Sequence, residues 1–194
     1  MGGRKKNTRS IKPGVYIIGE GITEQYYLSH VKRIFRLNYI VKPRFFGNSS
    51  ILELGKKIEA LIPDDVFVIC VFDADVSKYN KAEKQRLELL YNTYGDNPNV
   101  LLCDSLPSIE FWFLIHFLDT NRRFQNSSET ETLLKIHIEG YRKTKTFLEK
   151  EKWVADLCAD GKLELAIKRA KQYSDRSGSY SNLYKAFEML FENK

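Results

Sequence analysis

An uninterrupted apolar run from Val66 to Phe72 constrains the fold of this chain more than any other stretch, because two carboxylates follow it closely. Seven consecutive apolar residues are typical of a strand that is buried on both faces, as in the middle of a parallel sheet. Asp73 and Asp75 do not belong in such a core, so the strand must reach its surface where they begin. In open parallel sheets, ligands bind beyond the carboxyl ends of the strands, which makes this acidic pair the first candidate site.

Strand and helix patterns alternate along the first two thirds of the chain. Alternation of this kind predicts a parallel sheet with right-handed crossovers. We therefore expect an α/β fold with a parallel sheet of about four strands flanked by helices. The expected strands are 15–19, 39–46, 66–72 and 100–103, and the expected helices are 24–37, 51–61, 79–94 and 108–118.

The remaining segments differ in composition from this alternating part. Residues 1–12 are basic and free of acids, which predicts a disordered leader, whereas 13–118 form the expected α/β domain. Residues 119–194 have a helical pattern, with expected helices at 129–158 (with Gly140 as a candidate break), 162–173 and 181–192. No clear linker precedes this helical extension, so we expect it to pack on the sheet within the same globule.

Composition narrows the class of protein without fixing its function. The formal net charge of +6 permits an anionic partner such as nucleic acid without requiring one. The three cysteines form no CxxC motif, which argues against a zinc site and favours a reducing compartment. The chain has no recognisable signal peptide and no apolar run long enough to span a membrane, so we expect a cytoplasmic protein. A homo-oligomer stays possible.

Acids follow three of the expected strands, at Glu20, Asp73 and Asp104. Parallel strands place their carboxyl ends at one edge of the sheet, so these side chains are expected to converge. Carboxylates are preferred ligands of Mg²⁺, which uses one or two of them together with water and substrate phosphate. We take Glu20, Asp73 and Asp75 as the expected metal ligands and catalytic residues, with Mg²⁺ or Mn²⁺ as the cofactor. A lone Asp-x-Asp more often forms a turn than a metal site. The presence of Glu20 at the end of a second strand favours a metal site here.

A phosphate site is expected beside Glu20. Gly21 would let a phosphate approach the backbone, and the helix that begins with Thr23 as its N-cap favours an anion at its start.

Four segments together resemble a known family. Glu20-Gly21-Ile22-Thr23-Glu24 followed by Asp73-Ala74-Asp75 resembles the TOPRIM pattern of a strand-end glutamate and a later Asp-x-Asp. The segments 105–117, with sequence SLPSIEFWFLIHF, and 141–143, with sequence YRK, are similar to the RloB-like family within that fold. The resemblance implies a TOPRIM-like α/β domain, a metal-dependent nuclease acting on DNA or RNA in anti-phage defence, and an ATPase partner subunit. It adds Glu24, Glu110 and Lys143 as supporting site candidates.

Two other functions remain open from the sequence. Ala74 and Val76 replace more polar residues of the family pattern. The chain could therefore be a catalytically degenerate module that binds nucleic acid or a partner. A haloacid-dehalogenase-like phosphatase would use Asp73 as its nucleophile. That scheme leaves Glu20 unexplained and lacks a late acidic pair.

Overall fold

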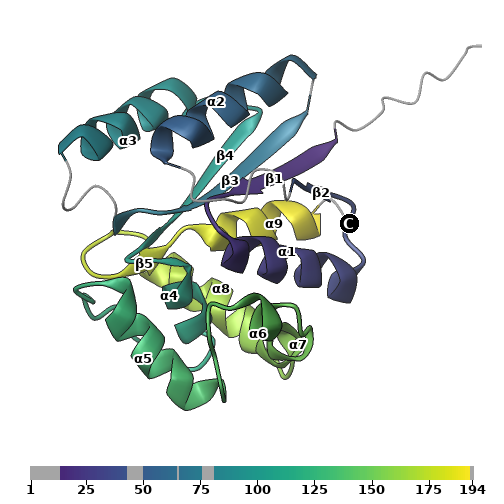
Figure 1. Cartoon of the computed structure of the whole chain (residues 1–194), viewed down its shortest axis with the longest axis vertical. Coiled ribbons are helices and arrows are strands. Elements are labelled where there is room, and N and C mark those ends of the chain that lie inside the picture. Colours follow the sequence, from purple (N-terminus) through teal and green to yellow (C-terminus); the bar gives the residue numbers. More distant parts are fainter. Residues whose placement is uncertain (1–13, 43–49, 65, 76–80, 193–194) are drawn as a thin grey trace, which may run out of the picture.

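The computed structural model describes residues 14–42, 50–64, 66–75 and 81–192. The expected basic leader 1–12, the second half of the expected second strand and the start of the third expected helix lie outside these residues. The described residues form a five-stranded sheet with helices on both faces, which confirms the α/β fold (Figure 1). The strands are β1 (Val15–Gly19), β2 (Ile40–Val41), β3 (Phe67–Asp73), β4 (Val100–Leu106) and β5 (Tyr180–Ser181).

The strand order is β2-β1-β3-β4-β5, and the first four strands are parallel. The long apolar strand β3 therefore lies at the centre, paired with β1 on one side and β4 on the other. The β2 strand lies at one edge of the sheet. The β5 strand runs antiparallel to β4 at the other edge and was not expected from the sequence.

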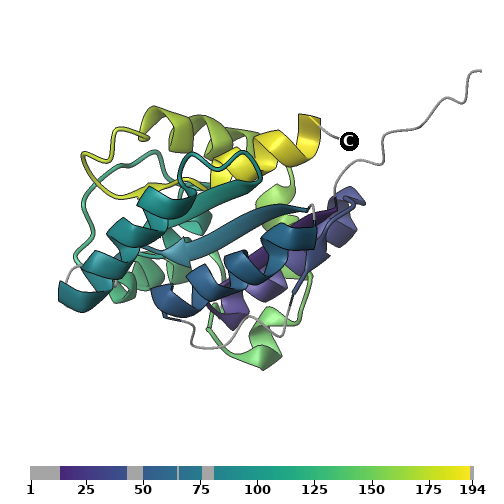
Figure 2. The ribbon, with the colours of Figure 1, turned by 90° about the horizontal axis from the view of Figure 1, so that it is seen from above.

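Helices cover the sheet in two unequal layers (Figures 1 and 2). Helices α2 (Ile51–Leu61) and α3 (Lys81–Tyr94) lie on one face, above the sheet in Figure 1. Helices α1 (Ile22–Phe35) and α9 (Leu183–Glu192) lie against the other face. Helices α4 (Ile109–Leu114), α5 (Ser127–His137), α6 (Lys145–Leu148), α7 (Lys152–Cys158) and α8 (Lys162–Gln172) extend that second layer.

Alternation along the central strands explains why both faces need cover. Ile17 and Ile69 pack with the α1 and α9 layer, whereas their neighbours Ile18 and Val68 pack with the α2 and α3 layer. Successive side chains of a strand point to opposite faces, so an unbroken apolar run buries both. Ser50 caps the start of α2, because its hydroxyl accepts a hydrogen bond from the Glu53 amide at 3.4 Å.

Strand register corrects the expectation for Asp104. The fourth strand continues to Leu106 instead of ending at residue 103, so Asp104 lies inside β4 and is only 1% exposed. In the β3–β4 pairing, Asp104 lies beside Phe72, whereas Asp73 lies beside Ser105. Side chains of registered neighbours point to the same face, so Asp104 faces the α3 side with Phe72 and Asp73 faces away from it.

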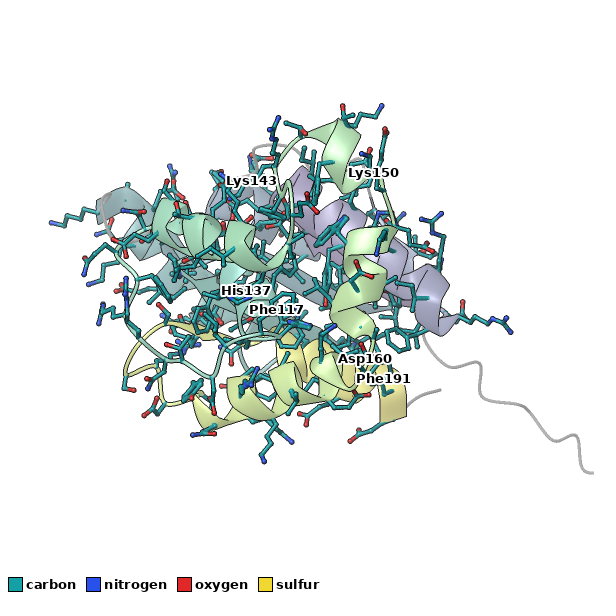
Figure 3. All side chains as sticks on the ribbon, turned by 90° about the horizontal axis from the view of Figure 1, so that it is seen from below. Phe117, His137, Lys143, Lys150, Asp160 and Phe191 are labelled. Carbon is teal, nitrogen blue, oxygen red and sulfur yellow. The ribbon has the colours of Figure 1, made fainter. Side chains whose placement is uncertain are left out.

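The C-terminal part is more broken than the helical pattern suggested. The expected helix 129–158 is three helices, and the expected break near Gly140 is confirmed by its left-handed φ of 69°. Helix α4 stops at Leu114 instead of residue 118. The end of the chain first adds β5 to the sheet and then forms α9, so the helical extension shares the core of the α/β part. The ring of Phe117 stacks on His137 of α5, at 4.9 Å between centroids (Figure 3).

Gly178 permits two loops to touch beside β5, and replacing it with alanine is expected to destabilise the protein. A Cβ atom there would lie 1.8 Å from the Asn121 carbonyl oxygen, which also accepts a hydrogen bond from the Ser179 amide at 3.2 Å. Overpacking of this kind costs about 3 kcal/mol, which lowers Tm by roughly 6–12 °C in a chain of this size. The control is Gly55→Ala, whose Cβ meets Leu90 at an ordinary 3.7 Å inside a helix. If thermal unfolding gives the same Tm for Gly178→Ala and Gly55→Ala, this prediction is wrong.

Candidate active site

A cavity of about 480 Å³ opens at the carboxyl ends of β1 and β3. It is lined by the end of β1, the first turn of α1, the end of β3, the first turn of α4 and the segment between α5 and α6. Segments far apart in the sequence therefore supply one site. Its lining residues are Glu20, Gly21, Ile22, Thr23, Glu24, Ser50, Asp73, Ile109, Glu110 and Lys143.

Two of the expected metal ligands meet at this cavity. The Glu20 carboxylate accepts a hydrogen bond from the Asp73 amide, with Oε2 and N 3.1 Å apart. The Asp73 carboxylate in turn accepts one from the Ile109 amide at 2.9 Å, which ties β3 to the start of α4. The parallel pairing of β1 with β3 places Gly19 beside Val71, so both acids leave the sheet at the same edge.

The turn from β1 into α1 holds Glu24, and it corrects the expected helix start. Helix α1 begins at Ile22 with Gly21 as its N-cap, so Thr23 lies within the first turn instead of capping it. The Glu24 carboxylate accepts a hydrogen bond from the Gly21 amide at 3.1 Å. A carboxylate there is also favoured by the helix dipole. Thr23 and Glu24 are 7% and 4% exposed, so both residues of this turn are largely buried where they line the cavity.

Glu110 is fully buried and fully hydrogen-bonded. Its Oε2 accepts from the Ser108 hydroxyl at 2.6 Å and lies 2.9 Å from the Lys143 ammonium, while Oε1 accepts from the Tyr141 hydroxyl at 2.9 Å. Figure 3 shows Lys143 on the segment between α5 and α6. Burial disfavours the charged form of Lys143, yet the charges of Glu110 and Asp73 outweigh it and raise its pKa. Lys143 therefore carries a positive charge into an otherwise acidic cavity.

The carboxylates around the cavity repel one another. Burial raises the pKa of Asp73 well above its usual range, and the charges of Glu24, Glu110 and Glu20 raise it further. Burial is also the main cause that raises the pKa of Glu24 to about 7, with added repulsion from Glu110 and Glu20. The pKa of Glu20 is raised by burial, against the opposing hydrogen bond from the Asp73 amide. Four carboxylates face one lysine here, and this excess of negative charge favours a bound cation.

The residues at this cavity fit a magnesium ion by their chemistry. No group of three or more metal-ligating side chains in the described ranges is already arranged around one point. Mg²⁺ does not need such a cage, because it usually keeps several waters and takes one or two carboxylates. Glu20 and Asp73 supply two carboxylates from neighbouring strands, each held by a backbone amide.

The structure places all of the other expected site residues at the cavity except Asp75. Gly21, Thr23, Glu24, Glu110 and Lys143 all line the cavity with Glu20 and Asp73. Asp75 is partly buried and is not among the described residues that line it.

Sequence reasoning missed three hydroxyl side chains at the site, those of Ser50, Ser108 and Tyr141. The Ser108 and Tyr141 hydroxyls hold Glu110, and Ser50 lines the cavity. Ser50 gives no site pattern of its own, whereas Ser108 and Tyr141 lie in the two segments that resemble the RloB-like family, and that resemblance could have indicated them.

Comparison with known proteins identifies the family. The family model described as RloB-like protein matches residues 15–190, which is most of the chain, so the chain belongs to the RloB-like family. No curated protein and no solved structure shows a significant match. Among the described residues, the helices are all too short or too polar to cross a membrane.

Proposed function

We propose that this member of the RloB-like family is a metal-dependent nuclease that hydrolyses phosphodiester bonds in DNA or RNA. The observation that carries the proposal is the meeting of Glu20 and Asp73 at the carboxyl edge of the sheet, within a cavity that holds four carboxylates and one lysine. Such a cavity suits a divalent cation and a phosphate together, because the substrate supplies the oxygens that the protein does not.

The contacts of Glu20, Asp73 and Lys143 support the role proposed for each. Glu20 and Asp73 would hold Mg²⁺ or Mn²⁺, and Asp75 follows them as a further candidate ligand. The bound ion supplies charge stabilisation for the phosphodiester as it is attacked. Lys143, held by Glu110, neutralises a phosphate oxygen. The Gly21 amide itself donates to Glu24, so the amides that follow it in the first turn of α1 are offered to the same anion. Glu24, whose pKa is raised to about 7, holds or releases a proton at neutral pH.

The biological setting forms a second part of the proposal. The resemblance to defence-associated TOPRIM subunits suggests that the chain acts against phage together with an ATPase partner. The excess of 31 lysines and arginines over 25 acids supports contact with an anionic polymer.

The test is cleavage of plasmid DNA, single-stranded DNA, RNA and tRNA with Mg²⁺, with Mn²⁺ or with EDTA, beside a Glu20→Gln variant. Cutting that requires the ion, and that falls about a hundredfold in the variant, is the expected result. Glutamine keeps the oxygen that accepts from the Asp73 amide, so the variant removes charge without removing the contact.

Three other outcomes separate the alternatives. Phosphate release from a small ester, without strand cutting, supports a phosphatase. Strand binding without cleavage, even with the ATPase present, supports a degenerate binding module. Cutting that survives unchanged in Glu20→Gln shows that the nuclease activity does not use this cavity.

A further inference from the structure

A second cavity, of about 490 Å³, lies at the same edge of the sheet but has the opposite charge. It is walled by the end of β3, helix α3, strand β4, the loop between α4 and α5, and the segment from Arg176 to Tyr180. Three cationic side chains face one acid in its lining. The lining residues are Ala74, Lys84, Leu87, Tyr91, Asp104, Leu106, Arg123, Arg176 and Tyr180.

Arg176 is held in place on one side of this cavity. Its guanidinium lies over the rings of Tyr180 and Tyr91, at 4.9 and 5.5 Å from their centroids. Its Nη2 approaches Asp104 Oδ1 at 3.4 Å and the Tyr91 hydroxyl at 3.5 Å. Both contacts use Nη2, so Nε and Nη1 make no hydrogen bond with other described residues. A guanidinium fixed in this way is prepared to donate to a planar or tetrahedral anion.

Asp104 orients Arg176 and is otherwise satisfied. The carboxylate accepts from the Tyr180 hydroxyl at 2.7 Å and from the side-chain Nδ2 of Asn182 at 2.7 Å. A buried carboxylate with these donors has little capacity left for a ligand cation. Asp104 therefore forms part of the cavity wall, and it does not make this cavity a second metal site.

Lys84 and Arg123 complete the positive charge from two further elements. Both side chains are exposed, and within the described ranges neither forms an ion pair. Lys84 lies on α3 and Arg123 on the loop before α5, whose position beside Ser179 is fixed by the bond from the Phe124 amide to the Ser179 hydroxyl at 3.0 Å. Three cations from separate segments thus converge on one hollow, which favours an anionic ligand.

The two cavities are joined by consecutive residues of one strand end. Asp73 lines the acidic cavity and Ala74 lines the basic one, because successive side chains leave the strand toward opposite faces. A ligand that carries evenly spaced anionic groups can occupy both, with one group at the metal site and another at the cations. A nucleic-acid strand has this chemistry, since each nucleotide carries one phosphate.

We infer that the basic cavity formed by Lys84, Arg123 and Arg176 binds a backbone phosphate of the nucleic-acid strand whose scissile phosphate lies in the acidic cavity. This inference rests on the proposed nuclease function for its choice of ligand. The contacts are to phosphate and not to bases, so the cavity positions the strand without reading its sequence. It therefore serves DNA and RNA strands alike.

The test is strand binding in EDTA, where cleavage cannot occur, by the Lys84→Ala/Arg123→Ala double variant. The probes are fluorescein-labelled single-stranded DNA and RNA of twelve nucleotides, followed by fluorescence anisotropy across a range of salt concentrations. We expect Kd to rise roughly tenfold for both probes. The slope of log K against log salt should fall by about 0.7, as the loss of one phosphate contact predicts for a single strand.

The matched control is Lys150→Ala/Lys168→Ala, which removes the same charge from exposed positions away from both cavities (Lys150 is labelled in Figure 3). Its Kd should change less than twofold. Equal weakening in both double variants, no weakening in Lys84→Ala/Arg123→Ala, or a wild-type protein that binds neither strand overturns the inference. Circular dichroism that matches the wild type confirms that the variants are folded.

Cleavage assays keep this inference separate from the proposed nuclease. If the double variant binds strands more weakly but the wild type cuts nothing with any ion, the phosphate cavity stands and the nuclease fails. If the wild type cuts with Mg²⁺ while strand binding is unchanged in the variant, the nuclease stands and the phosphate cavity fails.

Discussion

Asp73→Asn is expected to lose metal-dependent cleavage on the order of a thousandfold and at the same time to gain thermal stability in metal-free buffer. The loss follows because the carboxylate charge would hold the cation against the substrate. The gain follows because burial and three neighbouring carboxylates already disfavour the charged form of Asp73. Asparagine keeps the Oδ1 that accepts from the Ile109 amide, so the structural contact persists.

Relief of this repulsion should stabilise the fold by about 1–2 kcal/mol, which corresponds to a rise in Tm of roughly 2–8 °C. The measurements are initial cleavage rates with Mg²⁺ and calorimetric unfolding in EDTA. Asp96→Asn is the control, since Asp96 is exposed and remote from the cavity, and it should change neither quantity. A variant that loses both activity and stability would show that Asp73 has a structural role.

The unfolding free energy of the metal-free protein is expected to increase as the pH falls from about 8 to 6, before the buried His116, whose pKa is lowered to about 3, opposes folding strongly at lower pH. Glu24 has a pKa near 7 in the folded protein, against an ordinary value of 4.5. Between these values the folded state binds more protons than the unfolded state, so acidification favours folding, by up to about 1.4 kcal/mol per pH unit for one group. The loss of unfolding free energy caused by burying the charged Glu24 carboxylate is fully present above pH 7 and disappears below about pH 4.5. Asp73 and Glu20 act in the same direction, because their pKa values are also raised.

Magnesium should weaken this pH dependence, because the ion and the protons compete for the same carboxylates. At pH 8, Mg²⁺ at a hundred times its Kd should add about 2.7 kcal/mol of stability, and the gain should shrink toward pH 5. The measurements are urea unfolding curves at each pH, with EDTA or with Mg²⁺. Glu24→Gln serves as the matched variant and should flatten the metal-free curve. Stability that decreases from pH 8 to pH 6 in EDTA contradicts the assigned carboxylate repulsion.

Local sequence determined the centre of the fold and the first two acids of the site. The seven-residue apolar run of β3 requires cover on both faces, and the acids that follow it require an exit from the core. Strand and helix patterns alternate strongly, and that order alone fixes a parallel sheet. Glu20 and Asp73 were therefore predictable as neighbours, because parallel strands end at one edge.

Tertiary structure alone decided which charges share a cavity. The β3–β4 register places Asp104 beside Phe72, so the Asp104 side chain points to the opposite face of the sheet from Asp73. A register shifted by one residue would reverse that direction. The two-residue β5 strand is too short to leave a periodic pattern, yet it brings Arg176 to Asp104. Glu110 and Lys143 meet across 33 positions of chain only because α4 and the segment before α6 pack together. Periodicity along a chain sets which side of an element a residue occupies, and packing between elements sets what that residue faces.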